Sequence, residues 1–293
     1  MAASLTAPTA DWSGEDVSLE DVLRQLGALR LRADTDAVPE LRTNVMTHMA
    51  WIPQEWAEAA EQALEGLAER HPSRTLLLVP LPDEPDGLDA SVSLKRFAIE
   101  GQERRVSTEV IELRLRGSRA AAPASIVWPL LIPDLPVFLR WRGEPPWGAS
   151  ELDQLVDVTD RLVVDSREWG ELRYGKLGSL FARTAVSDIA WARITPWRWA
   201  LARMWPEIAE IHRLSVRGPK ADSGLLVRWL RSRLDREVAL ERQDADELEA
   251  VAVDGAEVLP PRVERKTPSD LLSEQLDQFG HDIVYEAAVL AVS

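Results

Sequence analysis

The sequence predicts an α/β protein in which an N-terminal lobe with a mixed, mostly parallel sheet is followed by a second, smaller α/β lobe. Residues 74–80 form a short, continuously apolar run that ends in a proline, which is typical of an interior strand covered on both faces. Residues 91–99 and 106–115 alternate between apolar and polar side chains and leave no room for a helix between them, which predicts an antiparallel hairpin on that sheet. Strand-like and helix-like segments alternate again after residue 211, which indicates the second lobe.

The first elements of the chain are expected to be a helix, a strand and a second helix. Residues 1–17 have the character of a disordered tail, and Ser18 is a residue type that caps the start of a helix. The apolar stripe of this first helix consists of Val22, Leu23, Leu26 and Leu29. Residues 43–52 alternate enough to form a strand, and Pro53 then opens a helix that is expected to run to Arg70.

The middle and the end of the chain continue this alternation. Pro123 and Pro129 interrupt the segment 120–131, so only a broken helix is expected there. The other predicted elements are strands over 137–141, 161–165, 211–217, 237–241 and 248–253, and helices over 150–155, 171–183, 196–204, 224–234, 269–278 and 282–290. We predict an N-terminal α/β domain over residues 18–190 and a C-terminal α/β domain over residues 191–293, although no Gly/Ser-rich linker separates them.

The composition disfavours several classes of function. The chain has 293 residues, more than a single hydrophobic core usually supports, and its net charge of −15 disfavours a nucleic-acid partner. It contains no cysteine, which excludes disulfides, thiolate nucleophiles and cysteine-ligated metals. The first ten residues lack the pattern of a signal peptide, and no stretch approaches ~18 uninterrupted apolar residues. We therefore expect a cytoplasmic protein that has no membrane partner.

Common catalytic and cofactor-binding motifs are missing from the sequence. The close glycine pair in residues 174–179 resembles a truncated phosphate-binding loop, but it lacks a preceding apolar strand and is expected to form a turn or the start of a helix. The four histidines are too far apart to suggest a metal site, and the Gly-x-Ser-x-Gly motif of hydrolases is absent. We therefore expect no catalytic residues, no metal and no cofactor, and a protein that is not an enzyme.

Tryptophan is the residue type that stands out, with 12 copies in the chain and two local concentrations, in residues 137–147 and 188–200. Both segments interleave arginine with tryptophan, and these two residue types are enriched at the energetic centres of protein interfaces. The candidate interface or ligand residues in these segments are Arg140, Trp141, Asp188, Arg193, Trp197 and Arg198. Core packing is the alternative, and it is the interpretation we favour for Trp128, Trp191 and Trp229.

Polar residues near strand ends supply further candidates, since α/β proteins bind ligands at the carboxyl ends of their strands. Asp134 lies in a proline-bracketed turn, although it precedes its strand and so lies at the less favourable end. Ser166 and Arg167 follow the predicted strand 161–165, where they could hold an anion. Asp165 could instead cap a helix there, and capping is the interpretation we favour.

Several segments of the chain, taken in order, resemble one protein family. They are Arg42-Thr-Asn-Val-Met-Thr, His71-Pro-Ser-Arg, Pro133-Asp-Leu-Pro-Val, Asp165-Ser-Arg-Glu-Trp, Ser187-Asp-Ile-Ala-Trp-Ala-Arg-Ile-Thr-Pro-Trp-Arg, Leu271-Leu-Ser-Glu-Gln-Leu and Asp282-Ile-Val-Tyr-Glu-Ala-Ala. Over roughly residues 18–290 the chain resembles the OpcA family of bacterial glucose-6-phosphate dehydrogenase assembly proteins. The resemblance implies a partner, the NADP-reducing dehydrogenase of the oxidative pentose phosphate pathway, whose activity or oligomer the protein would support. Since this chain lacks cysteine, no control through its own thiols is expected.

Two alternatives stay open at this point. The protein could be a sensor or enzyme that binds a sugar phosphate or nucleotide around Asp134, Arg140, Ser166 and Arg167. It could also be a scaffold whose tryptophans all lie in the core. If the interface hypothesis is right, replacing Trp197 and Arg198 is expected to abolish partner binding while the fold is retained.

Overall fold

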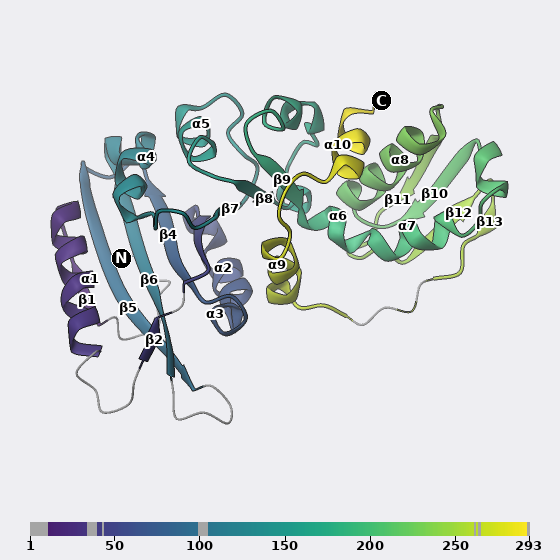
Figure 1. The fold of residues 1–293 in the computed structure, drawn as a ribbon. Helices are drawn as coiled ribbons and strands as arrows, with labels where there is room; N and C mark the ends of the chain where they lie inside the picture. Colours follow the sequence, from purple (N-terminus) through teal and green to yellow (C-terminus); the bar gives the residue numbers. More distant parts are fainter. Residues whose placement is uncertain are drawn as a thin grey trace. The chain divides into compact units, whose positions relative to one another are not determined.

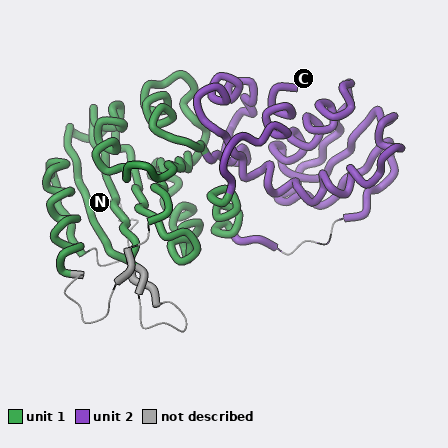
Figure 2. Tube along the Cα trace, viewed as in Figure 1, with its two compact units in different colours: residues 1–162, 268–277 green, residues 163–267, 278–293 purple. Residues whose placement is uncertain are grey.

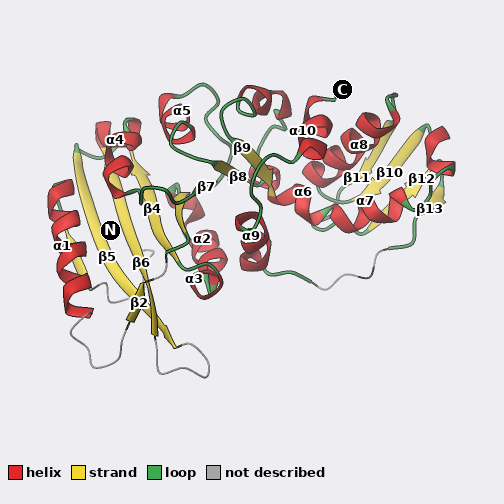
Figure 3. Ribbon diagram, viewed as in Figure 1, coloured by secondary structure: helices red, strands yellow, loops and turns green. Residues whose placement is uncertain are grey.

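The chain divides into two compact units, and this computed structural model describes most of each. The described residues are 11–33, 40–42, 44–98, 105–260, 262 and 265–291. Unit 1 consists of residues 1–162 and 268–277, and unit 2 consists of residues 163–267 and 278–293 (Figure 2). Both units combine sheets with helices, so the predicted α/β class is confirmed (Figure 3).

Unit 1 is built around a mixed sheet in which four neighbouring strands run parallel (Figure 1). Its strands are β1 (Trp12–Gly14), β2 (Glu40–Arg42), β3 (Met46–Trp51), β4 (Ser73–Leu81), β5 (Gly87–Ala98), β6 (Arg105–Arg116) and β7 (Val137–Trp141). The order is β1-β5-β6-β4-β3-β7, with β2 beside β6. Pairing is parallel from β6 through β4 and β3 to β7, whereas β5 runs antiparallel to β6 and β1 antiparallel to β5. The predicted interior strand and the predicted hairpin are therefore both confirmed.

Helices cover this sheet. They are α1 (Leu19–Ala33), α2 (Ala57–Leu64), α3 (Leu67–Arg70), α4 (Pro123–Val127), α5 (Ser150–Val156) and α9 (Pro268–Leu276), with 3-10 turns η1 (Gln54–Trp56), η2 (Gly117–Ala121) and η3 (Trp128–Leu130). The interior position of β4 explains its apolar sequence, because Leu76, Leu77 and Leu78 are all buried although alternate residues point to opposite faces.

The first helix begins where the sequence predicts. The Ser18 hydroxyl accepts a hydrogen bond from the Asp21 N–H at 3.2 Å, and the Asp21 carboxylate accepts one from the Ser18 N–H at 3.0 Å. This reciprocal pair satisfies two N–H groups at the start of α1. Val22, Leu26 and Leu29 are buried as predicted, but Leu23 lies on the exposed side of the helix.

The single helix expected from Pro53 to Arg70 is wrong, because the chain turns at Gly66. This glycine has a φ of 68°, a left-handed conformation that separates α2 from α3. Helix α9, from near the end of the chain, packs against both of these helices. The Ser269 hydroxyl donates to the Glu65 carbonyl at 2.7 Å, and His71 Nε2 lies 2.6 Å from the Ser273 hydroxyl.

Unit 2 contains a second, four-stranded sheet of order β11-β10-β12-β13. Its elements are η4 (Ser166–Glu168), η5 (Tyr174–Ser179), β9 (Ala185–Asp188), α6 (Ile189–Arg193), α7 (Thr195–Ala202), η6 (Glu207–Glu210), β10 (Arg213–Arg217), α8 (Lys220–Leu234), β11 (Ala239–Gln243), β12 (Ala250–Val253), β13 (Ala256–Glu257) and α10 (Ile283–Leu290). Strand β10 pairs parallel with β11 and antiparallel with β12, and α8 connects β10 to β11. The division between the units falls within β8 (Arg161–Val164).

Other local expectations differ from the structure. The helix predicted over 171–183 is wrong, because only the 3-10 turn η5 forms there. Trp128 was expected in the core but is 66% exposed, whereas Trp191 and Trp229 are buried as predicted. Of the tail predicted to be disordered, residues 1–10 lie outside the described residues, and Trp12–Gly14 form a strand because they pair with β5. The predicted domain boundary at residue 190 stays a prediction.

None of the helices in the described part of the chain combines the length and the apolar character that a membrane span needs.

Candidate functional site

The candidate site lies in unit 2, where strand β8 ends. The residues of β8 are buried, and Asp165 directly follows the strand. The Asp165 carboxylate accepts a hydrogen bond from the Arg167 N–H at 3.2 Å and thereby caps the 3-10 turn η4. The favoured capping role of Asp165 is therefore confirmed.

Asp188 ends strand β9 and lies fully buried next to this turn. Its Oδ1 accepts hydrogen bonds from the Ala190 N–H at 2.9 Å and from the Ser166 N–H at 3.0 Å. Asp188 thus caps α6 and ties the end of β9 to the turn that follows β8. The Tyr285 hydroxyl also points to Asp188 Oδ2, at 3.4 Å.

Burial and a neighbouring carboxylate shape the titration of this cluster. Burial is the main cause that raises the pKa of Asp188 to about 7, and the charge of Asp165 acts in the same direction. The hydrogen bonds from Ser166 and Ala190 favour the charged form and offset part of the shift. Burial also raises the pKa of Tyr174 and of Tyr285, with Asp188 as the next cause.

The two arginines of the cluster are each held by carboxylates. Arg193 contacts Asp165 through two nitrogens, at 2.8 and 2.9 Å. Arg167 donates to both oxygens of Asp222, at 2.7 and 2.6 Å, and to Glu247 at 3.0 Å. Burial acts to lower the pKa of Arg167, but its two acidic partners outweigh this and raise the pKa. Such forked pairs fix the arginines and leave little of their charge for an anionic ligand.

A pocket of about 270 Å³ in the described part of unit 2 opens beside this network. Ser166 and Arg167 line it together with Lys220 and Asp246. The Ser166 side chain is also the hydrogen-bond acceptor for the Tyr174 hydroxyl, at 3.0 Å. Among the described residues, no group of three or more histidines and carboxylates is placed to hold a metal ion.

A second set of candidates surrounds the start of α7. The guanidinium of Arg198 stacks on the Trp191 ring, 3.6 Å from its centroid, and donates to the Thr195 hydroxyl. Burial lowers the pKa of Arg198 to about 10, although Asp282 acts against the shift. Trp191 Nε1 donates to Asp282 at 2.9 Å, so Arg198 holds the face of the ring and Asp282 holds its N–H edge. Trp197 is 7% exposed and so packs in the interior of unit 2.

The remaining candidates belong to unit 1 and form no part of this cluster. Arg140 is buried on β7, where its Nη1 donates to the Trp141 carbonyl. The Trp141 ring stacks on Trp51 of the neighbouring strand, with centroids 4.9 Å apart. Asp134 is exposed in a turn, with a φ of 64°. Within unit 2, by contrast, the structure does bring Ser166, Arg167, Asp188 and Arg193 together.

Several members of the cluster were not among the candidates predicted from the sequence. They are Asp222 on α8, Glu247 and the two tyrosines. One signal was present in the composition: the chain has only two tyrosines, and both lie against the buried end of Asp188 or Ser166. Trp199 and Trp205 were not candidate residues either, although Trp199 lies in the tryptophan-rich segment 188–200; both are 67% exposed, on α7 and in the turn after it.

Comparison with known proteins identifies the family. Residues 64–175 match the family model for the N-terminal domain of the glucose-6-phosphate dehydrogenase subunit, and residues 184–289 match the model for its C-terminal domain. The chain is 26% identical over 253 residues to the OxPP cycle protein OpcA of Nostoc punctiforme, covering 75% of this chain and 54% of that protein.

Two further relatives carry the same name. The OpcA of Synechocystis sp. is 25% identical over 181 residues, which are 57% of this chain and 38% of that protein. The OpcA of Synechococcus elongatus is 24% identical over 183 residues, which are 57% of this chain and 41% of that protein. The matched region thus spans about half or less of the length of each curated relative. With both domain models matched in order, the chain belongs to the OpcA family.

Proposed function

We propose that this OpcA-family chain is a non-catalytic, cytoplasmic partner of glucose-6-phosphate dehydrogenase that promotes the assembly or allosteric activation of that enzyme in the oxidative pentose phosphate pathway. The observation that carries the proposal is the pair of domain models named for that dehydrogenase, which match residues 64–175 and 184–289. An activator of this kind acts by binding one state of its target more tightly than another.

The buried network of unit 2 supports a structural role for its charged residues. Arg167 and Arg193 are each neutralised by carboxylates of the same unit, so their first effect is to hold η4, α6 and α8 in place. In this proposal Ser166, Asp188 and the two arginines do not contact the partner; they hold in place the elements whose exposed side chains bind it.

The exposed tryptophans are the better candidates for direct contact. Trp199 and Trp205 expose about two thirds of their surface, and Arg203 between them is also exposed. Exposed aromatic rings next to arginine are typical of the energetic centre of a protein interface. Because Trp197 is buried, its replacement by alanine is expected to weaken the fold of unit 2 as well as any binding.

The test is a titration of the dehydrogenase from the same source with the full chain. We expect co-elution of the two proteins and a change in the kcat or KM of the dehydrogenase. The double variant Trp199→Ala/Trp205→Ala is expected to weaken binding at least tenfold, about 1.4 kcal/mol, with an unchanged melting temperature.

Trp128→Ala is the matched control, because Trp128 is equally exposed but lies in unit 1. Its binding is expected to equal that of the natural chain. Absence of both co-elution and any kinetic change with the natural chain would refute the proposed function.

Binding of a sugar phosphate is the second candidate function, and the pocket beside Ser166 and Lys220 is the observation in its favour. The pairing of Arg167 with Asp222 and Glu247 weighs against it, since an anion must compete with two carboxylates. A thermal-shift series with sugar phosphates and nicotinamide nucleotides tests this candidate, and flat melting temperatures would exclude it.

A further inference from the structure

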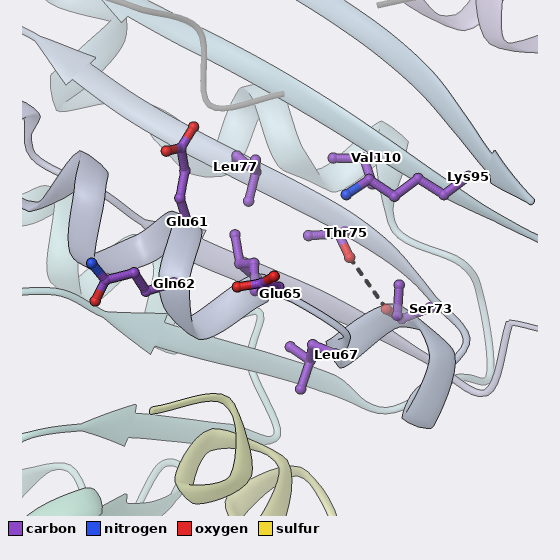
Figure 4. A pocket seen from close by; sticks show the side chains of 11 residues that line it. Glu61, Gln62, Glu65, Leu67, Ser73, Thr75, Leu77, Lys95 and Val110 are labelled. Atoms are coloured by element: carbon purple, nitrogen blue, oxygen red, sulfur yellow. Dashed lines mark hydrogen bonds between the residues drawn. The ribbon is translucent and has the colours of Figure 1, made fainter. Parts of the chain in front are cut away.

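The helices of unit 1 differ in how their outer sides are used. Helix α2 packs on the sheet and also on α9. A pocket of about 390 Å³ remains between α2 and the sheet, and Figure 4 shows that the hydroxyls of Ser73 and Thr75 in its wall hydrogen-bond to each other, at 3.2 Å. Helix α1 instead lies along the margin of unit 1 beside β5, with apolar side chains on its outward face (Figure 1). That face has no role in the proposed function.

The outward face of α1 carries an apolar stripe that is centred on a glycine. Leu23, Gly27 and Leu31 follow one another at intervals of four residues, so they lie on one side of the helix. Leu23 is 39% exposed and Leu31 is 70% exposed, whereas Val22 and Leu26 are buried on the opposite side. A row of exposed apolar residues over two helical turns is the pattern of a helix that packs against another helix.

Gly27 lies in the middle of both the helix and the stripe. A Cβ atom at this position would meet no atom of the described residues within 4 Å, so nothing in this part of the chain requires a glycine. In a helix interior, glycine is less favourable than alanine by about 0.5–1 kcal/mol. What glycine permits is the close approach of another backbone, and Gly27 is therefore the point of α1 at which a second helix can come nearest.

The two ends of α1 carry opposite charges. Glu20 and Asp21 lie in its first turn, and Arg30 and Arg32 lie in its last turn. Arg30 is bonded to Glu109, but Glu20 is exposed and forms no ion pair with the part of the chain that the structure describes. Antiparallel pairing of two α1 helices brings the acidic turn of each against the basic turn of the other, whereas parallel pairing opposes like charges. The charges therefore favour a second, antiparallel copy of α1 as the partner.

The stripe also has the symmetry that such a pair needs. A two-fold axis at Gly27 places Leu23 of each copy against Leu31 of the other, because both leucines are four residues from the glycine. Two identical subunits that meet across a two-fold axis must use one self-complementary surface. Rows of residues spaced by four are also the ridges that pack together in the commonest class of helix pair.

We propose that this chain forms a two-fold homodimer in which the α1 helices of two copies pack antiparallel, cross at Gly27 and contact each other through Leu23 and Leu31. Because the contact is made by one helix of 15 residues, we expect a weak dimer with a micromolar dissociation constant. The tryptophans proposed to contact the dehydrogenase belong to unit 2, so this inference does not depend on the proposed function.

The test is sedimentation velocity of the full chain without any partner protein, at concentrations from about 1 to about 300 µM. The natural chain is expected to change from monomer to dimer over this range. Leu31→Ser is expected to weaken the dimer at least tenfold, because the substitution removes apolar contacts on both sides of the two-fold axis. Leu290→Ser is the matched control, since Leu290 is 56% exposed on α10 of unit 2, and it is expected to dimerise as the natural chain does.

Gly27→Ala separates a role in the dimer from a role in the fold. Alanine favours the helix, so the melting temperature of the dilute, monomeric variant is expected to be equal or higher. The same substitution puts two methyl groups at the crossing point and is expected to weaken the dimer at least fivefold. Gly175→Ala is the control, because a Cβ at Gly175 also meets no described atom within 4 Å, and its dimer is expected to equal that of the natural chain.

A charge exchange tests the antiparallel arrangement. Glu20→Arg faces Arg32 of the second copy and is expected to weaken the dimer at least threefold, as is Arg32→Glu. The double variant Glu20→Arg/Arg32→Glu restores opposite charges across the axis, and its dimer is expected to return to within twofold of the natural one.

The inference is overturned if the natural chain stays monomeric over the whole range, or if Gly27→Ala and Leu31→Ser dimerise as tightly as it does. A double charge variant that binds no better than the single variants would overturn the antiparallel pairing of α1.

Discussion

The two units each bury a carboxylate, and they treat it in opposite ways. In unit 1, Glu109 on β6 accepts hydrogen bonds from Arg30 at 2.5 and 2.9 Å and from Arg74 at 2.8 Å. In unit 2, Asp188 accepts hydrogen bonds from two backbone N–H groups and a tyrosine hydroxyl, and the charge that acts on its pKa is that of another carboxylate, Asp165. Burial acts to raise the pKa of both groups.

Whether the pKa of the buried carboxylate rises or falls depends on whether arginines pair with it. Arg30 and Arg74 outweigh burial and bring the pKa of Glu109 below its ordinary value, whereas the pKa of Asp188 rises to about 7. Hydrogen bonds from amides alone therefore do not keep a buried carboxylate charged when a second carboxylate lies beside it. Glu109 in unit 1 is thus a charged group paired with two arginines, whereas Asp188 in unit 2 keeps its proton up to a pH of about 7.

The largest expected effect comes from breaking the pair in unit 1. Glu109→Gln leaves Arg74 buried without its carboxylate, and we expect the free energy of unfolding to fall by about 3 kcal/mol. Urea denaturation followed by tryptophan fluorescence measures this loss. Glu58→Gln, an exposed position on α2, is the control and is expected to change stability by less than about 0.5 kcal/mol.

If Glu109→Gln and Glu58→Gln unfold with equal free energies, the pairing of Glu109 with the arginines does not stabilise unit 1. The contrast between Glu109 and Asp188 would then fail.

The next effect concerns the proton held by Asp188. Its ordinary pKa is 3.8, so as the pH rises from about 4 to about 7 the unfolded chain loses this proton while the folded chain keeps it. The free energy of unfolding therefore falls across this window and levels off above it. Asp188→Asn removes this dependence and keeps an oxygen that accepts from Ser166 and Ala190.

We expect the stability of Asp188→Asn relative to the natural chain to increase on the order of 2–3 kcal/mol between pH 5 and pH 8. Parallel urea denaturation curves of both proteins at the two pH values measure the difference. If that difference is the same at both values, Asp188 is already charged in the folded protein and the contrast with Glu109 fails.

The smallest effect is expected at the surface of unit 2. Arg217 on β10 and Glu249 lie 3.0 Å apart, and both side chains are about half exposed. Water and salt screen such a pair, so Arg217→Ala is expected to change the free energy of unfolding by less than about 0.5 kcal/mol. A loss of more than about 1 kcal/mol, measured in the same urea titration, would show that burial does not explain why the Arg74–Glu109 pair stabilises the fold more than the Arg217–Glu249 pair.

Much of the fold follows from local patterns in the sequence. The apolar run of β4 and the alternation of β5 and β6 predict their strands, because burial on both faces or on one face fixes those patterns. Ser18 predicts the start of α1 because the cap is a local interaction, with its partner Asp21 close in the sequence. The break at Gly66 is harder to predict, because the residues around it favour a helix and packing against α9 is a distant interaction.

The candidate site could be predicted only in part. Ser166, Arg167, Asp188 and Arg193 stand near strand or helix ends, which is why the sequence points to them. Their partners do not: Asp222 is 55 residues from Arg167, and Tyr285 is 97 residues from Asp188. No local pattern encodes such distances along the chain. The same limit applies to Trp128, whose exposure depends on what packs around η3.

The path of the chain between the units has a consequence for its synthesis. The chain enters unit 2 after Leu162, returns to unit 1 with α9 and then passes back for α10. Synthesis proceeds from the N-terminus, so α2 and α3 emerge from the ribosome long before the helix that packs against them. Unit 1 therefore cannot complete its packing until residues 268–277 have been made, and a nascent chain that stalls near residue 260 would lack a helix of each unit.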